Sequence, residues 1–139
     1  NGQEVTGDCV VIGGGLVGAE TAEYLANKGH QVTIVEMMDK IAAGESTTVL
    51  PLMMKDFADH NVKQLVNTKV DHIENNIVYT ANDQIKADTI INALGSKKNI
   101  FDDSSITIPH VCVGDCSGER TADIASAIRT AYHAANEID

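Results

Sequence analysis

The residues whose types and spacing could do chemistry are glycines near the N-terminus. Gly13, Gly15 and Gly18 form the pattern G-x-G-x-x-G. They follow the apolar run 9–12 directly, and a helical pattern follows them, which is the context that a dinucleotide-binding turn needs. The first glycine would make the tight turn, the second would let the backbone approach a pyrophosphate, and the third would let helix and strand pack closely. The start of the helix would offer N–H groups to the phosphates. The predicted contacts are Gly13, Gly14, Gly15, Leu16, Val17 and Gly18.

A carboxylate follows where the adenosine ribose of such a dinucleotide would lie. Glu36 ends a β-branched segment about 20 residues after the glycines. Its carboxylate could accept hydrogen bonds from the ribose hydroxyls, and it would repel the 2′-phosphate of NADP(H). No Arg stands near Glu36 in the sequence, and Lys40 is the nearest cation. We therefore predict that the site binds NAD(H) in preference to NADP(H).

Periodicity predicts the elements that would position these residues. The run 9–12 reads as a strand buried on both faces, and a helix over 16–28 ends at Gly29. With a strand over 31–36, these elements make one βαβ unit. A second amphipathic helix is predicted over about 46–60.

From Val62 the apolar pattern changes toward period two. Short strands are predicted at 62–67, 70–73, 77–80 and around 85, with turns at Asn75-Asn76 and Asn82-Asp83. Further strands are expected over 88–95 and 110–115, and a last helix over about 122–136. The last strand would pair beside 89–95 or, alternatively, protrude or swap between copies. The predicted fold class is α/β, a Rossmann-like parallel sheet with flanking helices and a small antiparallel β-meander.

Composition limits the classes of partner. The 139 residues include 20 acidic and 10 basic side chains, which gives a formal net charge of −10. Such a surface repels phosphate backbones, so nucleic acid and anionic membranes are poor partners. The apolar runs are shorter than a membrane helix requires, and the polar N-terminus is unlike a signal peptide. We expect a cytoplasmic protein and regard the sequence as a piece of a longer one.

The remaining reactive side chains predict neither a metal site nor a catalytic group. Three cysteines, Cys9, Cys112 and Cys116, lack the spacing of a disulfide framework or a zinc site, and they suit a reducing compartment. The histidines are scattered among polar neighbours. We expect no catalytic residue here, because a cofactor performs hydride transfer while the protein orients it.

These motifs resemble the two-dinucleotide-binding flavoprotein superfamily. The resemblance rests on the glycine turn with Glu36, the meander, and the strand ending at Gly95. The segment 111–116 is similar to the Gly-Asp motif by which that superfamily holds FAD. The resemblance implies that Gly95 lies at the NAD(H) site, and that Gly114 and Asp115 contact FAD.

The string from Val10 to Glu23 is similar to one branch, the old-yellow-enzyme-type NADH:flavin oxidoreductases, which include 2-enoate reductase, 2,4-dienoyl-CoA reductase and trimethylamine dehydrogenase. This resemblance implies a parent with a barrel that carries FMN and an iron–sulfur cluster. The barrel and the cysteines that hold the cluster are not part of this sequence. Residues 1–98 would be the NAD(H)-binding domain, and residues 99–139 would return to the FAD domain or pack with 1–98 as one unit.

The implied function is NADH binding within a larger flavin oxidoreductase that reduces an activated C=C bond. The partners would be NADH and the FAD and barrel domains of the parent, with a homo-oligomer as a further possibility. We expect the chain alone to bind a nucleotide without catalysing. The alternatives are a module that holds ADP, a structural module, or part of an NADH-oxidase or disulfide-reductase-like flavoprotein.

Overall fold

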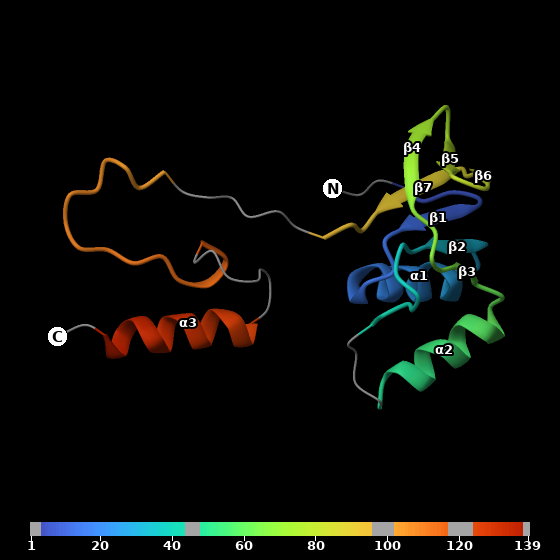
Figure 1. The fold of residues 1–139 in the computed structure, drawn as a ribbon. Coiled ribbons are helices and arrows are strands. Elements are labelled where there is room, and N and C mark those ends of the chain that lie inside the picture. Colours follow the sequence, from blue (N-terminus) through green and yellow to red (C-terminus); the bar gives the residue numbers. More distant parts are fainter. Residues whose placement is uncertain (1–3, 44–47, 96–101, 117–123, 138–139) are drawn as a thin grey trace. The chain divides into compact units, whose positions relative to one another are not determined.

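The computed structural model describes residues 4–43, 48–95, 102–116 and 124–137 (Figure 1). The chain folds as two compact units, Asn1–Gly95 and Ser96–Asp139. Each unit is described by itself below.

The first unit is built on a four-stranded parallel sheet with the strand order β3-β2-β1-β7. Its strands are β1 (Cys9–Ile12), β2 (Val32–Val35), β3 (Lys63–Leu65) and β7 (Thr89–Asn92). Helix α1 (Leu16–Asn27) connects β1 to β2, and α2 (Leu50–Asp59) connects β2 to β3. The predicted α/β fold with a Rossmann-like parallel sheet is therefore confirmed. The predicted start of α2 near residue 46 lies outside the described residues.

Strand β1 is buried on both faces, as its continuous apolar run predicts. Cys9 and Val11 belong to the core under α1 and α2, where Phe57 is buried. Val10 and Ile12 belong to a second core under the meander. Successive side chains of a strand point to opposite faces, so one four-residue segment joins the two cores. Figure 1 shows α1 and α2 on one face of the sheet and the meander on the other.

The meander has fewer strands than the sequence pattern indicated. It consists of β4 (Val70–Glu74), β5 (Ile77–Thr80) and β6 (Gln84–Lys86), all antiparallel. The predicted strand at 62–67 is instead β3, which pairs parallel with β2. Three residues of alternating pattern do not encode which neighbour they will pair with. The predicted turn at Asn75-Asn76 is present, with φ of +48° and +62°.

The second unit contains a short 3₁₀ turn, Gly114–Cys116 (η1), and α3, Ile124–Asn136. The predicted strand over 110–115 is wrong, because residues 110–113 have no strand structure and the 3₁₀ turn follows them. A strand is stabilised by pairing, and the described part of this unit offers no other strand. Helix α3 forms as predicted, but Ile124, Ile128 and Tyr132 on its apolar face are 65–80% exposed.

Candidate nucleotide-binding site

The turn from β1 into α1 requires glycine at its first and last positions. Gly13 has a φ of +98°, and a Cβ there would lie 2.6 Å from the carbonyl oxygen of Ala93 on the neighbouring strand. A Cβ on Gly18 would lie 1.9 Å from the carbonyl oxygen of Gly13. Gly13 therefore allows the turn, and Gly18 allows α1 to pack on the end of β1, in line with the roles inferred from the sequence.

Gly15 differs from both, because a Cβ on it would meet no protein atom within 4 Å. Its backbone is extended, with φ −64° and ψ −177°, so the fold itself does not require glycine here. Gly15 is the N-cap of α1, and no side chain caps this helix end. The first N–H groups of an α-helix lack partners within the helix, so this end can accept an anion. Leu16 and Val17 stand exposed in the first turn.

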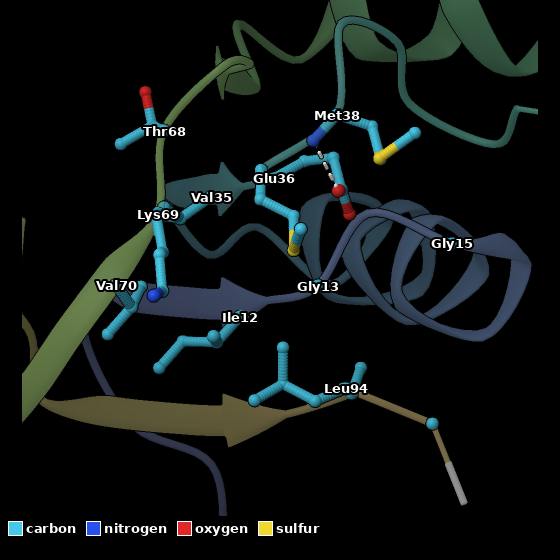
Figure 2. A pocket seen from close by; sticks show the side chains of 13 residues that line it. Ile12, Gly13, Gly15, Val35, Glu36, Met38, Thr68, Lys69, Val70 and Leu94 are labelled. Carbon is cyan, nitrogen blue, oxygen red and sulfur yellow. Dashed lines mark hydrogen bonds between the residues drawn. The ribbon is translucent and has the colours of Figure 1, made fainter.

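The Glu36 side chain ties the glycine turn to the end of β2. One carboxylate oxygen accepts a hydrogen bond of 2.6 Å from the Gly14 N–H. The other accepts one of 2.7 Å from the Met38 N–H, which Figure 2 shows as a dashed line. Glu36 is 8% exposed. A Cβ on Gly14 would come within 3.0 Å of the Glu36 Cβ and 2.5 Å of Ile41 Cδ1. The carboxylate therefore has a structural task, and each oxygen retains a lone pair for a ribose hydroxyl.

These elements enclose a cavity of about 440 Å³ above the carboxyl ends of β1, β2 and β7. It is lined by Ile12, Gly13, Gly15, Val35, Glu36, Met37, Met38, Thr68, Lys69, Val70, Ala93, Leu94 and Gly95. Open α/β sheets bind ligands in the crevice outside the carboxyl ends of their strands, where the strand order reverses. Here the order reverses between β1 and β7. The volume falls in the range of about 300–1,000 Å³ that is typical of cofactor pockets.

Most residues predicted for the NAD(H) site gather at this turn. Gly13, Gly15, Glu36 and Gly95 line the cavity. Gly14 contacts Glu36, and Leu16 and Val17 follow in the first turn of α1.

Lys69 lines the same cavity and is missing from the predicted set. It lies between β3 and β4, and Figure 2 shows its side chain reaching toward Ile12 and Val70. Lys40, which is nearer to Glu36 in the sequence, is not among the lining residues. The sequence shows Lys69 only as a basic residue just before the meander. The pairing of β2 with β3 is what places it at the cavity.

The two residues predicted to contact FAD lie in the second unit. Gly114 has a φ of +66°, and its N–H donates a hydrogen bond of 2.8 Å to the Thr130 hydroxyl on α3. Asp115 lies in the same 3₁₀ turn, and its side chain is outside the described part of the chain.

The described ranges contain no group of three or more His, Cys, Asp or Glu side chains that could hold a metal ion. In the same ranges, no helix is both long and apolar enough to cross a membrane.

Comparisons with known proteins agree with this geometry. Residues 2–110 match the family model described as pyridine nucleotide-disulphide oxidoreductase. The chain is 46% identical over 138 residues to a bilirubin reductase of Mediterraneibacter gnavus, covering 94% of this chain and 21% of that protein. It is 30% identical over 141 residues to a cinnamate reductase of Clostridium sporogenes, covering 93% of this chain and 21% of that protein.

A solved structure extends the similarity to the fold. The complex of 2-naphthoyl-CoA reductase with 2-naphthoyl-CoA superposes with a TM-score of 0.75 at 26% identity, covering 98% of this chain and 22% of that one. The chain therefore spans about a fifth of the length of the proteins that it matches.

Proposed function

The chain belongs to the pyridine nucleotide-disulphide oxidoreductase family, whose members use FAD and NAD(P)H, and from this premise we propose that its cavity at Gly13–Glu36 binds NAD(H). The observation that carries the proposal is the contrast between the glycines. Gly13 and Gly18 are required by the packing of the turn, whereas Gly15 faces open space beside an uncapped helix end. A glycine that no protein atom requires is explained by a ligand whose pyrophosphate approaches the backbone there.

The place of Glu36 supports NAD(H) as the nucleotide. Its carboxylate is held at the carboxyl end of β2 by two backbone N–H groups, so it is fixed before any ligand arrives. A fixed carboxylate can accept hydrogen bonds from the two hydroxyls of an adenosine ribose, and it disfavours a phosphate at the same position. The apolar lining from Ile12, Val35 and Val70 suits the flat adenine ring.

We further propose that this chain is the nucleotide-binding part of a larger flavin-dependent reductase. Residues 1–98 form the NAD(H)-binding domain, and residues 99–139, with Gly114 and Asp115, belong to its FAD domain. FAD would accept a hydride from the bound NADH and pass the electrons on. The residues of this chain bind and orient the nucleotide, and the groups that act on the final substrate lie outside it. The exposed apolar face of α3 supports this division, because such a face packs against another domain when it has one.

The proposed overall reaction is reduction of an activated C=C bond. The support is similarity to proteins named bilirubin reductase, cinnamate reductase and 2-naphthoyl-CoA reductase, each named for a conjugated substrate. Within the superfamily we propose the old-yellow-enzyme-type branch, with FMN and an iron–sulfur cluster in domains outside this chain.

Titration of the chain with NADH and with ADP tests the nucleotide proposal. We expect saturable NADH binding with a change in nicotinamide fluorescence, and weaker binding of ADP. Equal affinities without a fluorescence change would instead indicate a module that holds ADP. Absence of binding in a folded chain would indicate a structural role.

A further inference from the structure

We infer that Lys69 is a second determinant of cofactor choice, whose ammonium group contacts the 2′-phosphate of NADPH, so that the site accepts NADPH as well as NADH. This inference rests on the proposed nucleotide site. It concerns a residue that lies far from the glycine turn in the sequence and lines the same cavity.

The position of Lys69 is fixed by backbone hydrogen bonds to the end of β2. The Asn67 N–H donates to the Met38 carbonyl oxygen, and the Thr68 N–H donates to the Glu36 carbonyl oxygen, each at 2.8 Å. Lys69 is the next residue, so its backbone stands beside the strand end that carries Glu36. Its long side chain extends from there along the cavity wall (Figure 2).

The ammonium group of Lys69 is available to an anion. Lys69 belongs to neither of two ion pairs found among the described residues, Lys55–Asp59 and His110–Asp103. Glu36 and Lys69 are the two charged residues among those that line the cavity. In a chain of net charge −10, a lysine whose only charged neighbour in the cavity lining is Glu36 is a local source of attraction for a phosphate.

The Glu36 carboxylate remains a charge that opposes a 2′-phosphate, because two backbone N–H groups hold it in place. Lys69 supplies a charge of the opposite sign in the lining of the same cavity. NADPH binding therefore depends on Lys69, whereas NADH binding does not.

In the proposed binding mode the ribose lies beside the strand end that carries Glu36, and the long, exposed Lys69 side chain can turn toward it from the position near Ile12 and Val70 that Figure 2 shows. The pyrophosphate belongs at the uncapped end of α1 beside Gly15, while the adenosine ribose belongs at Glu36. A 2′-phosphate extends from that ribose, next to the strand end from which Lys69 projects. NADH carries an uncharged hydroxyl at this position, so removal of the Lys69 charge affects NADPH selectively.

Binding of NADH and NADPH to the 139-residue chain and to Lys69→Met tests the inference. Methionine keeps the length and apolar stem of the side chain and removes the charge. We expect Lys69→Met to weaken NADPH binding about fivefold, the effect of one exposed charge pair, and to change NADH binding less than about twofold. Raising the salt concentration should weaken NADPH binding more in the wild-type chain than in the variant.

Two matched controls remove one positive charge elsewhere. Lys63→Met changes an exposed residue of β3, and Lys40→Met changes the cation nearest to Glu36 in the sequence; neither residue lines the cavity. Both should keep the wild-type ratio of the two affinities. The role of Lys69 would be overturned if Lys69→Met weakened NADH and NADPH binding equally or changed neither. It would also be overturned if Lys40→Met selectively lost NADPH binding, or if the wild type bound NADH but not NADPH. Failure of the wild type to bind NADH would instead refute the site itself.

Discussion

The Glu36 carboxylate accepts a hydrogen bond of 2.6 Å from the backbone N–H of Gly14, and this contact joins the end of β2 to the glycine turn. The second carboxylate oxygen accepts the Met38 N–H at 2.7 Å. One buried side chain therefore positions both segments that border the nucleotide cavity. This relationship gives Glu36 two tasks, one in the stability of the fold and one in ligand binding.

Replacing Glu36 with glutamine should impair both tasks. The glutamine amide has one acceptor oxygen and one NH₂ group, so it can accept from Gly14 or from Met38 but not from both through separate oxygens. A buried N–H left without an acceptor costs about 1–3 kcal/mol. We expect Glu36→Gln to lower the free energy of unfolding by that amount in urea titrations and to weaken NADH binding.

Glu74→Gln is the charge-matched control for this experiment, because Glu74 is exposed at the end of β4. It should leave both measurements close to the wild-type values. A Glu36→Gln chain as stable as the control would show that the two hydrogen bonds contribute little.

The nucleotide turn could be predicted from the sequence because its constraints are local. Gly13 and Gly18 are required by backbone atoms a few residues away or on the adjacent strand, so residue type and spacing carry the information. The cavity wall depends on pairing between distant strands. Lys69 reaches the site through the contact of β2 with β3, and the pattern at 62–67 did not indicate which strand would be its partner.

The prediction of a strand over 110–115 was wrong for a related reason. Its apolar pattern is that of a strand, but a strand forms only where a neighbour pairs with it. The apolar face of α3 is likewise evident in the sequence, but the sequence pattern does not show what covers it, and the face is exposed in the structure.

The contact between α1 and α2 predicts a dependence of stability on pH. Burial raises the pKa of Glu23, and a side-chain hydrogen bond and the charge of Asp56 raise it further. Because the folded pKa lies above the unfolded one, this carboxyl group stabilises the fold at low pH, and the contribution is lost as the pH rises through the raised pKa. Glu23→Gln, which mimics the protonated form, should raise the Tm by about 2–4 °C at pH 7.

Near pH 4 the Glu23→Gln chain and the wild type should unfold at nearly the same temperature. Glu74→Gln serves again as the control, with no gain expected at pH 7. A Tm difference between wild type and Glu23→Gln that is independent of pH would contradict the link to this carboxyl group.

The cysteines should differ in reactivity. Burial raises the pKa of the Cys9 thiol, and the charges of Asp8 and Asp88 raise it further, whereas Cys116 is exposed. Since the thiolate is the reactive form, Cys9 should react with a thiol reagent on the order of 100-fold more slowly than Cys116 in the native chain. Mass spectrometry of timed samples would assign each modification, and all three cysteines should react at similar rates in urea.

The packing of α1 on β1 predicts a large cost for a methyl group at Gly18. A Cβ there would lie 1.9 Å from the Gly13 carbonyl oxygen, so the backbone would have to move. We expect Gly18→Ala to lose about 1–3 kcal/mol of unfolding free energy, in the range of overpacked cores. An unfolding midpoint equal to that of the wild type would contradict this account of the turn.

Gly15→Ala tests the central claim most directly, because a Cβ at this position meets no protein atom within 4 Å. The measurement is a fluorescence titration of NADH into the wild-type chain and into Gly15→Ala, with urea unfolding of both. The predicted result is saturable binding by the wild type, at least about tenfold weaker binding by Gly15→Ala, and unfolding free energies within about 1 kcal/mol of each other. Equal NADH affinity in the two chains, or no binding by the folded wild type, would contradict a pyrophosphate site at this turn.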